Sequence, residues 1–336
     1  MPRLRMNQAI ALALREEMER DPTVVVFGED IAEAEGPFKT SEGLLERFGP
    51  VRVRDTPISE TGFLGAAVGA ALTGLRPVVE IMFVEFLGVA LDQVVTEAAM
   101  MHYLSGGNLS VPLTVRASCG SGLGFGCQHS QTLERWLLGT PGLKLAVASG
   151  ARSAYGLTKV AIRDPNPVVV LEPRTLYGRR EDFEPNEGAV LPLGVGEIMR
   201  QGDDLTVVAL GQTVAVAIEA ASQADGWQAE VIDLRTLMPW DRKLVEESVA
   251  KTGRFVTVEE NQLTGGWGAD IASYVASRCH ESLRAPVVRI TAPDVHVPYS
   301  SELEQKFLPT APYVASQIAS LVSTGKTPEH WWEKEG

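Results

Sequence analysis

The sequence predicts an α/β protein made of two doubly wound domains, each built on a parallel sheet covered by helices. Short, fully apolar runs such as residues 24–27 (Val-Val-Val-Phe) suit strands of a parallel sheet buried on both faces. These runs alternate with helical segments along most of the chain, which is the order that βαβ units produce. The 336 residues, 45% hydrophobic and 22% charged, are enough for about two domains with full cores.

The first half of the chain opens with a surface helix over residues 6–20, where apolar side chains recur at four-residue steps from Met6 to Met18. A buried strand over 24–27 follows, and then an acidic loop and a short helix over 44–48. The further elements predicted in this half are strands 51–53, 78–82, 112–116, 144–148 and 168–172, the helix that starts near Glu60, and helices 88–104 and 151–162.

Residues 173–202 break this pattern, because charges, prolines and glycines crowd together there as in an interdomain linker. A second α/β set follows, with strands 205–210, 229–234, 254–259 and 287–291 and helices 213–224, 241–251, 267–282 and 312–323. The tail carries Trp331 and Trp332, a pair that indicates either docking onto a neighbouring molecule or a disordered terminus.

The charge balance and composition exclude several classes of protein. A formal net charge of −13 argues against a nucleic-acid surface. The longest uncharged apolar stretch, residues 61–75, is shorter than the ~20 residues that span a bilayer, so we expect no membrane segment. The three cysteines have no C-x-x-C spacing, and no His/Cys pair has zinc-ligand spacing, which favours a reduced, cytoplasmic protein without zinc.

Residues 55–63 (Asp-Thr-Pro-Ile-Ser-Glu-Thr-Gly-Phe) place one carboxylate, Glu60, between a turn stiffened by Pro57 and a helix rich in glycine and alanine. Small residues let another backbone or a flat ligand come close, at a cost in helix propensity. A carboxylate at such a buried helix start is costly unless something requires it. An ordinary carboxylate at a helix N-terminus is the alternative explanation.

His129 is the second candidate, because it ends a glycine-rich loop on the C-terminal side of a strand, where open α/β sheets bind ligands. The alternating glycines of residues 120–126 are not the dinucleotide fingerprint, which requires G-x-G-x-x-G spacing. A loop histidine with a local hydrogen bond is the alternative. Glu29, which follows the first buried strand, could line the same sheet edge, although an ordinary strand-end charge is the simpler explanation.

At this point the residues match a family. Over nearly its whole length the chain resembles the beta subunit of the thiamine-diphosphate-dependent first component of 2-oxo acid dehydrogenase complexes of the pyruvate, branched-chain 2-oxo acid and acetoin types, which are transketolase-like. The stretches that carry the resemblance are residues 28–30, 55–60, 74–77, 92–93, 105–107, 128–131, 141–144, 161–164 and 302–304. No single stretch is specific, but together they are.

The resemblance implies four segments. They are a pyrimidine-binding domain over 1–185, a linker over 186–202, a transketolase C-terminal-like domain over 203–326 and a tail over 327–336.

The resemblance also assigns roles. Glu60 would contact the aminopyrimidine ring of thiamine diphosphate and favour its imino tautomer, whose nitrogen deprotonates the thiazolium carbon. Phe86 would stack on the pyrimidine, although a core phenylalanine is the alternative, and Glu29 counts among the cofactor-binding candidates. His129 would stabilise charge and assist transfer of the acyl group, carried as a C2 carbanion or enamine, to a lipoyl group.

Two ions belong to the same family pattern. Potassium would be bound largely by backbone carbonyls, at positions that correspond to Leu113, Ala161, Ile162, Asp164 and Asn166. Magnesium and the diphosphate are held by a GDG…N motif of the alpha subunit, and this chain has no such motif. The resemblance therefore implies an α2β2 heterotetramer in which the cofactor lies between an alpha and a beta chain, together with a lipoyl acyltransferase as partner.

Three functions remain open at this stage. The first is a dehydrogenase-complex subunit that acts on a 2-oxo acid or acetoin, and the segments 83–88 and 290–293 look most similar to the acetoin branch. The second is a two-chain carboligase, acyloin-forming or transketolase-like, that passes the carbanion to an aldehyde or ketone. The third is a non-catalytic subunit on the same fold, against which the presence of both Glu60 and His129 argues. Phe125 and Cys127, bulkier than is usual just before His129, indicate an unusual substrate.

Overall fold

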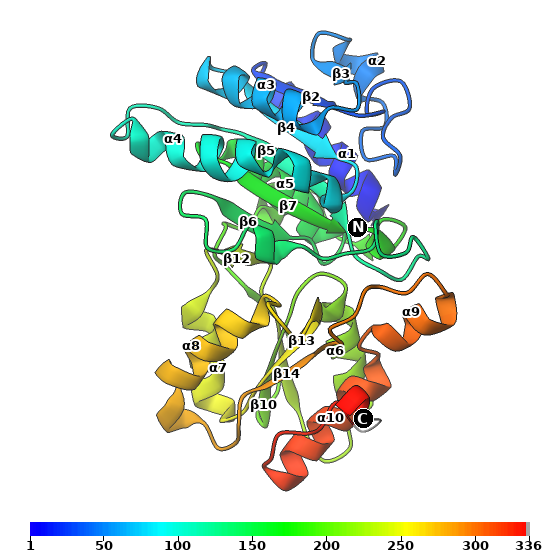
Figure 1. Cartoon of the computed structure of the whole chain (residues 1–336), viewed down its shortest axis with the longest axis vertical. Coiled ribbons are helices and arrows are strands. Elements are labelled where there is room, and N and C mark those ends of the chain that lie inside the picture. Colours follow the sequence, from blue (N-terminus) through cyan, green and yellow to red (C-terminus); the bar gives the residue numbers. More distant parts are fainter. Residues whose placement is uncertain (334–336) are drawn as a thin grey trace. The chain divides into compact units, whose positions relative to one another are not determined.

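The computed structural model describes residues 1–333, which form two compact units. Unit 1 comprises residues 1–119, 136–193 and 237–239, and unit 2 comprises residues 120–135, 194–236 and, within the described chain, 240–333. Each unit is built on its own sheet (Figure 1). The predicted fold class, two α/β domains with largely parallel sheets, is confirmed.

Unit 1 contains a seven-stranded sheet in the order β12-β6-β7-β5-β4-β2-β3. Its strands are β2 (Val24–Gly28), β3 (Val53–Asp55), β4 (Arg76–Ile81), β5 (Thr114–Cys119), β6 (Lys144–Val147), β7 (Val168–Pro173) and β12 (Thr236–Met238). The pairs from β6 to β3 are parallel. Because parallel strands present their carboxyl ends at one edge, the segments after β2, β3, β4 and β5 emerge together.

The helices of unit 1 are α1 (Met6–Arg20), α2 (Leu44–Phe48), α3 (Glu60–Leu72), α4 (Ala99–Leu104) and α5 (Ala151–Arg163). α1 packs on α5, and their apolar faces form one core with strands β2 and β7 (Figure 1). α3 packs on β4 and on the 3-10 helix η1 (Val84–Ala90). The predicted single helix over 88–104 is wrong in detail, since η1 is followed by a π-helical segment η2 (Gln93–Ala98) before α4.

Unit 2 contains a five-stranded sheet in the order β14-β13-β10-β11-β9. Its strands are β9 (Glu197–Arg200), β10 (Leu205–Ala209), β11 (Ala229–Asp233), β13 (Phe255–Gln262) and β14 (Val288–Ala292), and its helices are α6 (Thr213–Ser222), α7 (Arg242–Thr252), α8 (Gly268–Arg278), α9 (Ser301–Phe307) and α10 (Ala311–Thr324). α6 and α10 pack together over a core of aliphatic side chains. The pairs that link β14, β13, β10 and β11 are parallel, and β9 pairs antiparallel with β11.

Five short elements differ from the expectations. Residues 197–200, expected in the linker, form β9, and residues 301–307 form a helix that no pattern predicted. The strand expected at 51–53 lies at Val53–Asp55 instead. Strands β1 (Arg3–Arg5) and β8 (Arg180–Asp182) pair antiparallel with each other. Within residues 1–333, none of the helices is long and apolar enough to cross a membrane.

Candidate active site

Glu29 and Glu60 are brought together by two neighbouring parallel strands of unit 1. Glu29 follows β2 directly, and Glu60 begins α3 after the turn that follows β3. The amide of Thr56 donates to the carbonyl of Gly28 at 2.9 Å, which ties the two strand ends together. Gly28 has to be glycine here, because a Cβ would lie 2.6 Å from the carbonyl oxygen of Glu80 on β4.

Both carboxyl groups are nearly buried, each residue being 9% exposed. Burial raises the pKa of Glu29, and the charges of Glu60 and Asp30 raise it further, while the backbone of Ser59 lowers it. Oε1 of Glu29 is buried and makes no hydrogen bond within residues 1–333. A buried carboxyl oxygen without a hydrogen bond, beside a second acid, carries a cost that binding of a polar ligand would remove.

The aromatic ring of Phe86 lies in η1, the element that packs against the helix of Glu60. It is half-buried and packs edge-on against Phe83, with ring centroids 5.6 Å apart. The guanidinium of Arg174 lies over the other ring of this pair, 5.1 Å from the centroid of Phe83. Phe86 is therefore held in place by neighbours while part of its surface stays available to a flat ligand.

Beneath this edge of the sheet lies a fully buried ion network centred on Arg116 of β5. Its guanidinium binds Glu172 of β7 through two hydrogen bonds of 2.8 and 2.9 Å and Glu80 of β4 at 2.8 Å. Tyr177 and Thr40 donate to these two carboxylates. The two carboxylates hold the pKa of Arg116 above its usual range although burial alone would lower it. The network cross-links three central strands.

His129 belongs to unit 2, together with the whole glycine loop, which we define as residues 120–131. The imidazole is half-buried, and the amide of His129 donates to the carbonyl of Gly126 at 3.3 Å. The loop closes on itself where the amide of Gly120 donates to Gln131 at 3.0 Å. The chain runs on from the end of the loop to the buried residue Glu134, whose carboxylate accepts a 2.8 Å hydrogen bond from Asn261 of β13.

Glu134, in the same unit, is a buried acid whose pKa lies well above the usual value for a glutamate. Burial raises its pKa to about 7, against the hydrogen bond from Asn261, and the nearby charges of Glu260 and Glu259 act in the same direction as burial. Its side chain is completely enclosed next to the last residue of the glycine loop. The sequence analysis did not select Glu134, because a single acid in an amphipathic loop gives no pattern.

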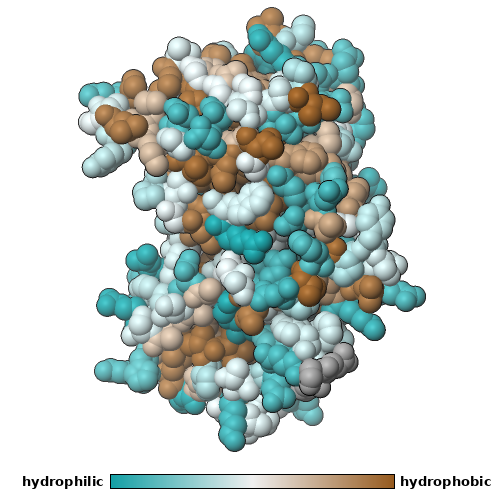
Figure 2. Space-filling model, in the orientation of Figure 1, coloured by the Kyte–Doolittle hydropathy of each residue, from teal (hydrophilic) through white to brown (hydrophobic). Residues whose placement is uncertain are grey.

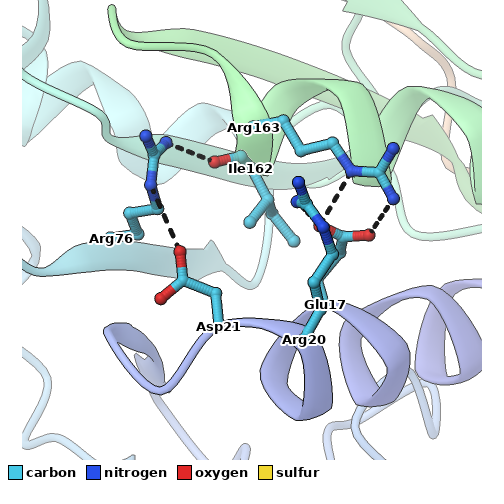
Figure 3. Close-up of a pocket in the computed structure, with 6 residues that line it drawn as sticks. All are labelled: Glu17, Arg20, Asp21, Arg76, Ile162 and Arg163. Carbon is cyan, nitrogen blue, oxygen red and sulfur yellow. Dashed lines mark hydrogen bonds and ion pairs between the residues drawn. The ribbon is translucent and has the colours of Figure 1, made fainter.

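The five positions that correspond to potassium ligands fall in unit 1, directly before β5, on α5 and in the turn after α5. Arg76 donates to the carbonyls of Ile162 and Asp164 at 2.9 and 3.1 Å, and Lys144 pairs with the Asp164 carboxylate at 2.5 Å. Figure 3 shows Arg76 reaching from β4 to the carbonyl of Ile162 and to Asp21, at a polar cavity of about 110 Å³. Two of the carbonyl oxygens expected to bind potassium therefore already accept hydrogen bonds from the guanidinium of Arg76.

The structure thus groups Glu29, Glu60 and the element of Phe86 in unit 1 and places His129 in unit 2. Within residues 1–333, His, Cys, Asp and Glu side chains nowhere form a metal-binding group of three or more. In the tail, Trp332 stacks on His330 with ring centroids 4.2 Å apart, and residues 334–336 lie outside the described part.

Sequence reasoning missed the Arg116 network and the acids that hold the glycine loop, Glu260 and Glu304. A usable signal existed for the network. Glu80, Arg116 and Glu172 are single charges near the ends of otherwise apolar strands, and buried charges of this kind are usually paired.

Comparison with known families and proteins agrees with this geometry. The family of transketolase pyrimidine-binding domains matches residues 3–180, and that of transketolase C-terminal domains matches residues 194–314. The pyruvate dehydrogenase E1 component subunit beta-2, mitochondrial, of Oryza sativa subsp. japonica is 44% identical over 90% of this chain and 82% of its own length. The pyruvate dehydrogenase E1 component subunit beta of Rickettsia bellii is 43% identical over 91% of this chain and 94% of its own.

Solved structures give the same fold. A split-gene transketolase, described as an inactive beta4 tetramer, superposes with a TM-score of 0.77 at 26% identity and covers 95% of this chain and 98% of its own. A transketolase variant from Pichia stipitis superposes with a TM-score of 0.72 at 18% identity, and 96% of this chain matches 47% of that longer one. The chain therefore belongs to the family of E1-component beta subunits, which combine a transketolase pyrimidine-binding domain with a transketolase C-terminal domain.

Proposed function

We propose that the chain is the beta subunit of a thiamine-diphosphate-dependent 2-oxo acid dehydrogenase that acts on pyruvate or a similar small 2-oxo acid. The observation that carries the proposal is the carboxyl pair Glu29 and Glu60, nearly buried at the carboxyl edge of a sheet in the domain that matches the pyrimidine-binding family. Two apolar side chains in these positions would stabilise the fold better than two buried acids, so the acids indicate a functional site.

The residues of this chain fit the aminopyrimidine end of the cofactor. Glu60 would share a hydrogen bond with a pyrimidine ring nitrogen, and its place in the first turn of α3 favours its ionised form. Glu29, whose pKa burial and the charge of Glu60 raise, would lie beside that carboxyl group at the same end of the cofactor. Phe86 would pack against the ring face. When bound, thiamine diphosphate supplies the nucleophilic carbon and the electron sink for decarboxylation.

His129 is proposed to orient and stabilise charge during passage of the acyl group to a lipoyl carrier. An imidazole suits this role because it changes its charge near neutral pH. The lipoyl acyltransferase of such a complex is the partner that would present the carrier. The relatives are named as beta subunits of pyruvate dehydrogenase E1, and the acetoin type stays a prediction from the segments 83–88 and 290–293.

An alpha subunit completes the site in this proposal. Magnesium and the diphosphate would be held there, since residues 1–333 contain no metal-binding group of acidic, histidine or cysteine side chains. α3 offers a face for that partner, because Gly62, Ala66 and Gly69 are exposed on one side of it. Exposed apolar side chains, among them Ile58 at 86% and Val89 at 67%, lie at the start of α3 and in η1, and Figure 2 shows hydrophobic residues at the surface of this unit. We propose an α2β2 heterotetramer.

A potassium ion on α5 is a further proposal, with the carbonyls of Leu113, Ala161 and Ile162, Asp164 and Asn166 as its ligands. The carbonyl oxygen has two lone pairs, so the hydrogen bonds from Arg76 do not use up these acceptors. Cytoplasmic location also stays a prediction, as relatives include bacterial and mitochondrial proteins.

The test is co-expression with an alpha chain of an E1 component, followed by assay of the assembled enzyme with thiamine diphosphate and magnesium. We expect reductive acylation of a lipoylated carrier domain with a small 2-oxo acid, pyruvate first. The proposal fails if neither a 2-oxo acid nor acetoin acylates the carrier while the assembled enzyme binds the cofactor.

A two-chain carboligase without a lipoyl acceptor is the second candidate. The similarity to the split-gene transketolase favours it, since that protein also divides its chain and is described as inactive as a tetramer of beta chains. The same assembled enzyme, supplied with an aldehyde acceptor instead of the carrier, distinguishes the two. Acyloin formation that exceeds carrier acylation would identify the carboligase.

A further inference from the structure

The alternating glycines at positions 122, 124 and 126 precede His129, and the proposed function gives them no role. All three glycines have a positive φ, which is +74° at Gly124 and +71° at Gly126. Three glycines two residues apart turn successive amide groups to one side, so that one acceptor can reach more than one of them. The structure contains such an acceptor within the same unit.

That acceptor is Glu304 of α9. Its Oε1 accepts from the amide of Gly122 at 2.7 Å, and its Oε2 accepts from the amide of Gly124 at 2.9 Å. The side chain is 3% exposed, whereas Glu302, two residues earlier and therefore on the opposite side of the same helix, is exposed. A buried carboxylate that receives two short backbone hydrogen bonds is well satisfied and holds its donors firmly.

The next glycine of the series is held by the same C-terminal segment. A Cβ on Gly126 would lie 2.3 Å from Cδ2 of Tyr299, so the tyrosine ring packs directly on the bare backbone. Glu260 of β13 anchors the start of the loop, where it accepts from the amide and the hydroxyl of Ser121 at 2.5 and 2.7 Å. The loop is thus fixed at its start by β13 and along its middle by residues 299–304.

We propose that Glu304, together with Tyr299, is a positioning group for His129. We call these two residues the clamp. The clamp sets the path of the glycine loop and thereby the place of the imidazole three residues beyond Gly126. This inference rests on the proposed function for His129. It goes beyond that function because it states that two residues of the C-terminal domain position His129, which lies in the segment after β5.

A carboxylate is required at this position for a geometric reason. Two backbone amides converge on two oxygens, so each oxygen serves one donor. In Glu304→Gln one oxygen becomes an NH2 group that cannot accept, and one amide loses its partner. In Glu304→Ala both amides lose theirs. The two variants therefore form a graded series, with Glu302→Ala as the matched control on the same helix.

The first measurement is hydrogen–deuterium exchange of the assembled α–β enzyme, read from peptides that cover residues 120–131. In Glu304→Ala we expect exchange at this loop to accelerate about tenfold or more, because hydrogen bonds to a charged group are lost. Glu304→Gln should lie between wild type and Glu304→Ala, and Glu302→Ala should match wild type. Peptides from β13 report whether the fold of unit 2 is retained.

The second measurement separates two reactions of the same enzyme: oxidation of the 2-oxo acid by an electron-accepting dye, and acyl transfer to the lipoylated carrier. Misplacement of His129 should lower transfer roughly 10- to 100-fold in Glu304→Ala. Dye-linked oxidation should fall less, so the ratio of the two rates changes. A merely structural loss would lower both rates together.

Unchanged exchange at residues 120–131 in Glu304→Ala would overturn the clamp. Faster exchange with the wild-type ratio of the two rates would overturn the positioning role. If the wild-type enzyme acylates no carrier, the proposed dehydrogenase function is wrong, whatever the variants show. The rate of transfer to an aldehyde acceptor is then compared with the rate of dye-linked oxidation instead. The exchange experiment retains its meaning in either case.

Discussion

Glu60 begins α3 at the carboxyl edge of the first sheet, with Glu29 beside it and a buried oxygen of Glu29 without a hydrogen bond in the described chain. In Glu60→Gln we expect catalysis to fall by roughly 10²- to 10⁴-fold, the range that a positioned acid or base contributes. The amide has nearly the same shape, so assembly should be intact. Hydrogen exchange at the reacting carbon of bound thiamine diphosphate measures the loss directly.

The control for Glu60→Gln is Glu33→Gln, an exposed acid in the loop after β2, which should behave as wild type. Retention of normal exchange at the cofactor carbon in Glu60→Gln would refute the role given to Glu60. Loss of assembly in that variant would instead identify Glu60 as a structural carboxylate.

Glu134 makes stability depend on pH near neutrality. Its pKa is about 7 in the folded chain and near the ordinary 4.5 when unfolded, so the folded state holds the proton more tightly. Its contribution to stability is complete below about pH 4.5 and is lost as the pH rises to about 7, with a total of about 3 kcal/mol at most. Glu134→Gln should therefore be more stable than wild type at pH 8, with the difference shrinking towards pH 5.

Thermal unfolding of wild type, Glu134→Gln and the exposed control Glu302→Gln between pH 5 and pH 8 tests this expectation. A constant difference in Tm between wild type and Glu134→Gln across that range would show that the carboxyl does not titrate there.

At the scale of an element, α3 combines a buried apolar face with an exposed face of small residues. A Cβ added at Gly69 would have no neighbouring atom within 4 Å. Gly69→Ala should therefore raise the stability of the chain by up to about 1 kcal/mol, because alanine has the higher helix propensity. Gly69→Leu should leave the isolated chain folded but prevent close approach of a second subunit.

Sedimentation of each variant mixed with the alpha chain separates these expectations, since only Gly69→Leu should fail to assemble. Normal assembly of Gly69→Leu would remove this face of α3 from the interface.

The elements that sequence patterns predicted are those whose side chains report burial directly. Strands 24–27, 78–82 and 168–172 are apolar except for one glutamate in each of the last two, and β2, β4 and β7 lie there within one or two residues. α9 has only two buried positions among seven residues, and β1, β8 and β9 are short strands with charged side chains. Their structure is decided by partners distant in sequence, which periodicity cannot register.

Some residues of the candidate site could likewise be predicted from the sequence, and others could not. Glu29 and Glu60 could be predicted as neighbours because each follows a strand, and parallel strands bring their ends together. Glu304 lies 182 residues from Gly122 and its acidic helix is typical of a solvated surface, so nothing local indicated its role. The grouping of residues 120–135 with unit 2 was equally invisible, since it depends on contacts with β13.

At the scale of the whole molecule, the proposed site is incomplete in one chain. The isolated chain should bind thiamine diphosphate at least about 100-fold more weakly than the assembly, because the magnesium and diphosphate contacts are assigned to the alpha subunit. Titration calorimetry of the chain alone and of the α–β assembly provides the comparison. Binding of equal strength by the chain alone would contradict a shared site.

Strand β12, residues 236–238, lies at the edge of the first sheet beside β6, although its sequence neighbours β11 and α7 belong to unit 2. During synthesis on the ribosome, the N-terminal sheet therefore stays one strand short until residue 238 has emerged, when β10 and β11 have already been made. A gene cut after residue 193 would encode a half with an open sheet edge, prone to pairing with other copies. The two halves of this polypeptide are accordingly poor candidates for separate expression.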